Sequence, residues 1–153
     1  MRLGIISVTT DSNDISTLAH PDCVVCGFGN ANGLHVEFTV DENSCVSAVF
    51  ACDKVYQGYP GIVHGGVVCS ILDGAMGRCM FARGLTAVTV EMTTKFRHPV
   101  VIGRQASVFA RIRLDQHPLY MLEAEIVQEG KVKATAEGKY YDQPKLKNYS
   151  ISK

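Results

Sequence analysis

The chain has 153 residues and a mass of 16.6 kDa, the size of a single domain. Hydrophobic residues make up 46% and charged residues 20% of it, so long-range disorder is excluded. Fifteen Lys and Arg balance fifteen Asp and Glu, which argues against a nucleic-acid partner. No apolar run approaches the roughly 20 residues that cross a bilayer, and the apolar stretch over residues 3–8 is too short for a signal sequence. We therefore expect a cytoplasmic protein without membrane contact.

Residues 1–20 are polar and irregular, which predicts a flexible N-terminal arm or a short surface helix. We expect a single domain over residues 21–143 and a polar tail over residues 144–153. The six cysteines do not indicate a disulfide scaffold, and most are expected to be reduced thiols.

A Cys-x-x-Cys pair lies in the glycine-rich loop over residues 21–33 and consists of Cys23 and Cys26. It could be half of a zinc site, a redox pair or part of an ordinary loop. A structural zinc site needs four ligands, and the sequence has no second Cys-x-x-Cys, although His20 and His35 are near. The ordinary loop is favoured, so we expect no metal and no cofactor.

Alternating apolar and polar residues predict two strands, over residues 34–40 and 45–51, joined by a turn. A loop rich in glycine and proline follows. Residues 66–82 form the one convincing helix, and because nearly all of its faces are apolar it should be buried. Arg83 and Gly84 provide a stop signal for this helix.

Four further strands are predicted around residues 88–93, 106–114, 120–128 and 132–136. In the first of these, Val88, Val90 and Met92 alternate with Thr89 and its polar neighbours, so the two sets should face opposite sides. The order of elements predicts an α+β fold with one long central helix wrapped by a curved antiparallel sheet of five to six strands. A sheet one layer deep leaves one side of the helix or one sheet edge uncovered, so we expect a homodimer or a dimer of dimers.

Two features of the helix suggest a chemical site. Asp73 is its only acidic residue, and a carboxylate among apolar positions needs a partner or a raised pKa. Gly65 and Gly66 follow His64 at its start, where free N–H groups could stabilise an oxyanion. Gly65 and Asp73 are about 12 Å apart along one helix, so a shared substrate would need Gly65 from one subunit and Asp73 from the other.

The spacing His64-Gly65-Gly66, an apolar run and Asp73 nine positions after the histidine resembles hotdog-fold acyl-CoA thioesterases of the PaaI-like (phenylacetyl-CoA thioesterase) group. The resemblance spans about residues 22–141. Further similar segments are residues 23–27, 32–34, 88–92 and 96–103.

The resemblance implies an acyl-CoA substrate and a role for each matching residue. Asp73 would act as general base on water or as nucleophile on the thioester. Gly65 would donate its N–H to the thioester carbonyl, while His64 would shape the loop and Thr89 would help to hold the water. The implied substrate-binding residues are Gly66, Gln57, Gly58, Arg97 and His98, of which the last two would meet pantetheine or the CoA phosphates.

Two positions depart from the family pattern. Relatives often carry asparagine where this chain has Gly58, with Gln57 beside it as a substitute, and many place glutamate where it has Gly74. A non-catalytic acyl-thioester-binding hotdog protein is therefore the alternative, and a hydratase or dehydratase of the same fold is less favoured.

Overall fold

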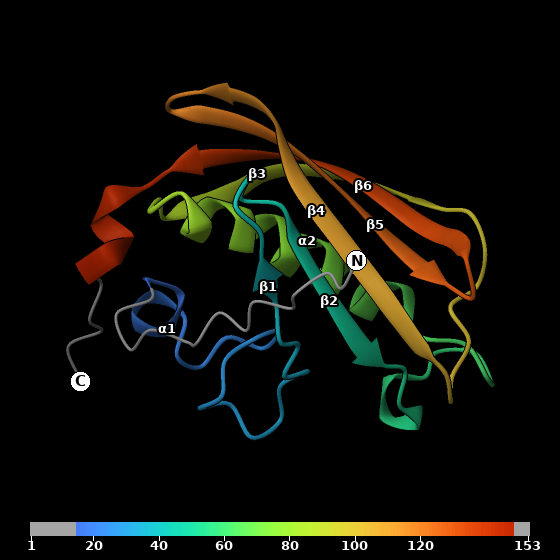
Figure 1. The fold of residues 1–153 in the computed structure, drawn as a ribbon. Helices are drawn as coiled ribbons and strands as arrows, with labels where there is room; N and C mark the ends of the chain where they lie inside the picture. Colours follow the sequence, from blue (N-terminus) through green and yellow to red (C-terminus); the bar gives the residue numbers. More distant parts are fainter. Residues whose placement is uncertain (1–14, 149–153) are drawn as a thin grey trace, which may run out of the picture.

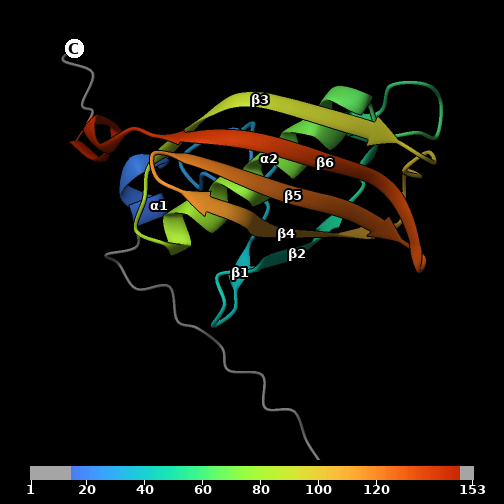
Figure 2. The same ribbon diagram turned by 90° about the horizontal axis from the view of Figure 1, so that it is seen from above.

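The computed structural model describes residues 15–148, which form one antiparallel sheet curved over one long helix (Figure 1; Figure 2). In chain order the elements are α1 (Ile15–Ala19), β1 (Thr39–Val40), β2 (Val46–Ala51), the 3₁₀ turn η1 (Lys54–Tyr56), α2 (Gly65–Ala82), β3 (Ala87–Phe96), β4 (Gln105–Gln116), β5 (Leu119–Gln128), β6 (Lys131–Asp142) and the 3₁₀ turn η2 (Pro144–Asn148). The sheet order is β1-β2-β4-β5-β6-β3. The predicted α+β architecture with six strands is confirmed, and no helix within residues 15–148 is long and apolar enough to cross a membrane.

The central helix α2 is held by apolar burial along most of its length. Each fully buried aliphatic side chain stabilises the fold by about 1.5–3 kcal/mol. The buried residues of α2 are Val68, Ile71, Leu72, Ala75, Met76, Cys79 and Met80. The helix ends as the sequence predicts, because Gly84 adopts a φ of 72° and the Leu85 N–H bonds to the Met80 carbonyl at 3.0 Å.

The face of α2 that points away from the sheet is covered by the segment over residues 20–36, in blue and cyan below α2 in Figure 1. Its central side chain is Val25, which is 5% exposed and lies where a Cβ on Gly74 would stand, at 2.6 Å from Val25 Cγ1. Of the two surfaces that the sequence leaves open, one side of the helix or one sheet edge, the helix side is thus covered beside Gly74, whereas β3 lies at an edge of the sheet.

The predicted strand over residues 34–40 is mostly wrong. Only Thr39 and Val40 pair with β2. Upstream, the N–H of Leu34 bonds to the Val24 carbonyl at 2.7 Å and the N–H of Val36 to the Val25 carbonyl at 2.8 Å. The alternating pattern is real, but these residues bond to the Cys-x-x-Cys loop instead of to the sheet.

The chain ends are described in part. Residues 1–14 of the expected arm and residues 149–153 of the expected tail lie outside the described residues. Within the described part, α1 contacts both α2 and η2. Residues 15–19 and 144–148 thus form short helical turns. For residues 15–19 this agrees with the predicted short surface helix and not with a flexible arm.

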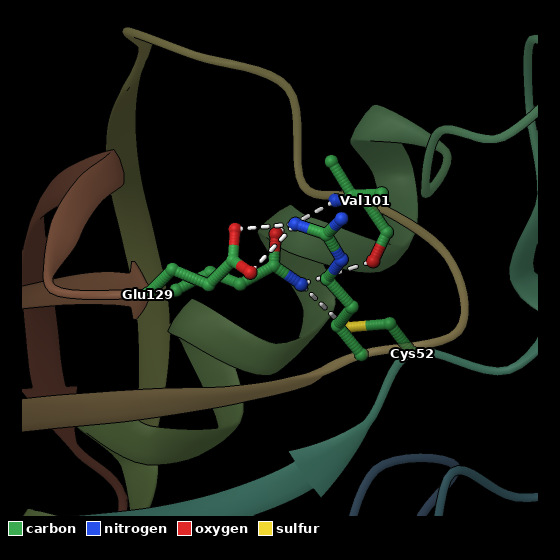
Figure 3. Close-up of polar contacts among 5 residues, drawn as sticks. Cys52, Val101 and Glu129 are labelled. Atoms are coloured by element: carbon green, nitrogen blue, oxygen red, sulfur yellow. Dashed lines mark hydrogen bonds and ion pairs between the residues drawn. The ribbon is translucent and has the colours of Figure 1, made fainter.

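A buried amide ties the loop before β4 to the end of β5. Gln128, 1% exposed, accepts a hydrogen bond from the Val101 N–H and donates one to the Val101 carbonyl, both at 2.9 Å, and its amide lies 3.7 Å from Cys52 Sγ (Figure 3). The neighbouring Val100 carbonyl accepts from the Val63 N–H at 2.9 Å. Gln128 therefore fixes a loop that in turn supports the chain just before α2.

Gly74→Ala should lower the free energy of unfolding by about 1–3 kcal/mol, because the new methyl group meets Val25 and the β-branched side chain has little room to move. Gly77→Ala is the matched control on the same helix. A Cβ there meets nothing within 4 Å, so it should stabilise by about 0.5–1 kcal/mol. Urea denaturation of both variants measures this difference, and equal stabilisation would contradict the packing of Val25 on α2.

Gln128→Leu should destabilise the fold by about 2–4 kcal/mol, since it leaves the Val101 N–H and carbonyl without their partner in a buried position. Arg104→Gln is the control in the same region (Figure 3). It breaks the ion pair between Arg104 and Glu129. Because these two side chains are 54% and 56% exposed, the free energy of unfolding should change by less than about 1 kcal/mol. Thermal or urea unfolding that ranks the two variants in the opposite order would contradict this role of Gln128.

Candidate functional site

The carboxylate of Asp73 is half-buried on α2 and is held by two hydroxyl groups from the sheet. Thr89 Oγ1 donates to Asp73 Oδ1 at 2.7 Å, and the Tyr140 hydroxyl donates to the same oxygen at 2.6 Å. Within residues 15–148 no donor bonds to the second oxygen, Oδ2. The two hydroxyls thus fix the orientation of the carboxylate, and Oδ2 is free to accept a proton or bind water.

A β-bulge brings the two hydroxyls to the same face of the sheet. Thr89 lies directly opposite Tyr140 in the β3–β6 register, and the register shifts between Thr89 and Glu91. Beyond the bulge, Met92 packs against the core. The expectation that Thr89 and Met92 face opposite sides is therefore wrong, because the extra residue returns both to the helix side.

Tyr140 completes the cluster around Asp73 and is not predicted from the sequence. It is 1% exposed, and burial together with the charge of Asp73 raises the pKa of its hydroxyl far above the usual value, so it remains a proton donor. Its ring lies over Gly138, where a Cβ would come within 2.7 Å of it. One feature of the sequence could have indicated this residue: Tyr140 is a large phenol in a strand whose other inward-facing residues are small. A buried hydroxyl requires a hydrogen-bond partner.

The start of α2 presents one free backbone donor. His64 caps the helix, and its Nδ1 accepts the Gly66 N–H at 2.9 Å. No acceptor for the Gly65 N–H is found in the described part of the chain. The ring of Phe96, at the end of β3, lies 3.4 Å from where a Cβ on Gly65 would be. Of the two expected glycine donors, Gly65 alone is therefore available to a ligand.

The loop before α2 contains Gly58, where the chain departs from the family pattern, and Gln57 beside it. Gln57 Oε1 accepts the Gly61 N–H at 2.9 Å, so its carbonyl closes the turn while its amide nitrogen can still donate. A Cβ on Gly58 would lie 3.2 Å from His64 Cα. A larger residue at position 58 would press on His64, which caps the helix.

Arg97 and His98 directly follow β3, are exposed, and both donate their N–H groups to the Lys133 carbonyl, at 2.8 and 3.0 Å. Desolvation lowers the pKa of His98, and the charges of Lys131, Lys133 and Arg97 lower it further. Three cationic side chains thus lie near His98, at the end of the strand whose Phe96 ring lies beside the start of α2.

One chain does not bring all predicted site residues together. Asp73, Thr89 and Tyr140 form one cluster, and His64, Gly65 and the loop over residues 57–61 form another. The first cluster is centred on Asp73 within α2 and the second lies at the start of α2, and the eight residues from Gly65 to Asp73 span about 12 Å of helix. A reacting group that touched Asp73 could not reach the Gly65 N–H of the same chain.

A third cluster of polar side chains lies in the segment that packs on α2 beside Gly74 and Phe81. His20, Cys23 and Cys26 have ligand atoms that all fall within 4.8 Å of one another. Hydrogen bonds from the Cys26 thiol and the His20 ring, with N–H groups of Cys26 and Val25, lower the pKa of Cys23 from 9.0 to about 3. The structure thus joins His20 to the Cys-x-x-Cys pair.

Comparisons with known proteins agree with this architecture. Residues 60–114 match the Thioesterase superfamily. Acyl-coenzyme A thioesterase THEM4 of Rattus norvegicus is 30% identical over 71 residues, covering 44% of this chain and 30% of the relative. The chain therefore spans about a third of the length of this curated relative.

Solved structures share the fold at low identity. The PaaI protein of E. coli, from the phenylacetic acid degradation operon, superposes with a TM-score of 0.68 at 22% identity, over 72% of this chain and 80% of that one. A thioesterase protein of Streptococcus pneumoniae with coenzyme A gives 0.66 at 17% identity, over 70% and 87%. Mutants of the same protein, one Asp-to-Ala and one Thr-to-Ala, are also among the matches. The chain thus shares its fold with these structures, PaaI among them, and its residues 60–114 are similar to the Thioesterase superfamily.

Proposed function

We propose that the protein is an acyl-CoA thioesterase that uses Asp73 as general base. The observation that carries this proposal is a half-buried carboxylate with one oxygen fixed by two hydroxyl donors and the other oxygen open. A purely structural aspartate would be expected to use both oxygens. The resemblance to the PaaI-like group and the name of the THEM4 relative support the same reaction.

In the proposed reaction, Asp73 Oδ2 accepts a proton from water while the water oxygen attacks the thioester carbonyl carbon. The Gly65 N–H, at the positive end of α2, stabilises the resulting oxyanion. Collapse of the intermediate breaks the C–S bond, and the proton held by Asp73 passes to the departing sulfur to give CoA and a free acid. Thr89 Oγ1 donates to Asp73 and can still accept a hydrogen bond from the water.

Two copies of the chain would complete each site. β3 is an edge strand of the sheet, and its exposed apolar side chains include Val88, Val90 and Phe96 at 40%, 59% and 58% exposure. An uncovered apolar edge favours association. Pairing of two β3 edges about a two-fold axis would bring Gly65 of one copy toward Asp73 of the other, because both residues lie on the helix next to β3.

The cations around His98 are proposed to receive the phosphates of CoA. Arg97 follows Phe96, whose ring lies 3.4 Å from where a Cβ on Gly65 would be, so the charged group and the proposed oxyanion donor lie near the same end of β3. Structures of the Streptococcus pneumoniae relative include its complex with coenzyme A. Its mutants replace an aspartate and a threonine that are separated by the same number of residues as Asp73 and Thr89.

A non-catalytic acyl-thioester binder is the second candidate, and the observation that favours it is Gly58. This residue contributes no side-chain group to the loop, and the Gln57 carbonyl is occupied by Gly61. Tight binding of acyl-CoA by the wild-type protein without turnover would select this candidate.

Asp73→Asn should lower kcat for thioester hydrolysis by about 10²–10⁴-fold, since it removes the base but keeps the shape of the side chain. Thiol release from a panel of aliphatic and aromatic acyl-CoAs, followed with a disulfide dye, measures the rate. Asp53→Asn is the control, because this exposed aspartate makes no side-chain cap bond and lies outside the proposed site. Equal rates for wild type and Asp73→Asn across the panel would contradict general-base catalysis by Asp73.

Mixed dimers test whether the site is shared. Gly65→Pro removes the proposed oxyanion N–H at a first helical position that proline tolerates, after His64 with an extended ψ of 136°. Gly65→Pro and Asp73→Asn should each be nearly inactive alone. Co-expressed, they should recover about a quarter of wild-type activity, because half of the dimers would carry one intact site of two.

Gly65→Ala is the control for this experiment, since it keeps the N–H and its methyl group makes an ordinary contact with Phe96. It should retain activity. Failure of the mixed dimers to recover any activity, although subunit exchange is shown by differently tagged chains, would exclude a site shared between subunits.

A further inference from the structure

We propose that His20, Cys23 and Cys26 form a zinc-binding site that fastens the loop over residues 20–36 to the outer face of α2. Three ligand atoms, one nitrogen and two sulfurs, already lie within 4.8 Å of one another. In a tetrahedral zinc site such atoms are about 3.4–3.8 Å apart. Side-chain movements of about an ångström would therefore bring all three to one ion.

The backbone around the pair has the geometry of a metal-binding turn. The Val25 N–H donates to Cys23 Sγ at 3.4 Å, and the Gly27 N–H donates to the Cys23 carbonyl at 2.9 Å. A Cβ on Gly27 would lie 2.2 Å from the Cys23 nitrogen, so only glycine allows the chain to fold this tightly. The turn points backbone N–H groups at a sulfur, which stabilises the thiolate form that binds metal.

The ligand set indicates the ion. Two thiolates and one imidazole are borderline-soft donors, which suit Zn²⁺ better than Ca²⁺ or Mg²⁺. Two thiolate charges would balance the charge of Zn²⁺, and binding would release the proton of the Cys26 thiol. His20 is exposed, so the fourth tetrahedral position would face solvent and take water.

The position of the cluster explains what the ion would do. Val25 lies between the two cysteines and fills the space beside Gly74 on α2, and its carbonyl accepts the Val36 N–H. The ring of His20 packs edge-to-face on Phe81 of the same helix, with centroids 4.8 Å apart. A metal ion joining His20 to the Cys-x-x-Cys turn would link two contacts, one beside Gly74 and one at Phe81, that lie about two turns apart on α2.

The test measures metal content of the whole chain, purified with a thiol reductant from cells grown with zinc. Wild type should carry about one zinc per chain. Cys23→Ser and Cys26→Ser should each reduce bound zinc at least tenfold, and His20→Asn should weaken retention against a chelator. Cys45→Ser is the matched control, because Cys45 is a half-buried free cysteine on another part of the fold and should keep the full zinc content.

Cobalt provides a readout that does not depend on the variants folding. Wild type reconstituted with Co²⁺ should show thiolate-to-cobalt charge transfer and the intense visible bands of a tetrahedral site. A chelator should lower the Tm of wild type and of Cys45→Ser, but not of Cys23→Ser. Two outcomes would overturn the proposal. In the first, wild type binds neither zinc nor cobalt under reducing conditions. In the second, its mass is lower by two hydrogens because Cys23 and Cys26 form a disulfide, and it takes up metal neither in this form nor after reduction.

Discussion

The carboxylate of Asp73 on an apolar helix is the constraint that organises the sheet around it. A charge among buried neighbours is costly to desolvate, and hydrogen bonds from both Thr89 and Tyr140 offset that cost at a single oxygen. Delivering two hydroxyls to one atom requires that β3 and β6 pair with these residues directly opposite, and the bulge after Thr89 allows this without turning the rest of β3 away from the core. The hydrogen bonds from Thr89 and Tyr140 therefore position both the Asp73 carboxylate and the edge strand β3.

The second constraint is that α2 is apolar on nearly all sides and must be covered on more than the sheet side. The segment over residues 20–36 supplies that cover through Val25 and Val36, both buried. This packing gives a physical reason for Gly74, one of the two departures from the family pattern: a glutamate there would have to displace Val25 from the helix. The packing of Val25 therefore accounts for glycine at position 74. The lack of a charge at this position says little about the chemistry of Asp73.

The sequence predicted what depends on local pattern. The helix, its stop at Gly84 and the four strands that follow it are consistent with periodicity. A meander of all four strands is wrong, because β3 pairs with β6 at the sheet edge and not with β4. The pattern of Asp73, His64 and Gly65 also pointed to the two polar clusters on α2. Tyr140 and Gln128 could not be found in this way, because their roles depend on partners 67 and 27 residues away in the chain. Period-2 alternation likewise cannot show a bulge, nor whether residues 34–38 pair with a sheet or with a loop.

The placement of both proposed catalytic elements on one helix has a consequence for symmetry. The Gly65 N–H belongs at the helix start, where the dipole favours negative charge, whereas Asp73 lies two turns further on, where hydroxyls from β3 and β6 can reach it. Neither can move toward the other without losing the feature that makes it useful. The proposed isologous interface would resolve this, because a contact from Gly65 of one copy to Asp73 of the other is necessarily repeated in reverse. One such interface would create two sites, and the exposed edge of β3, which carries Thr89, is the surface through which it would form.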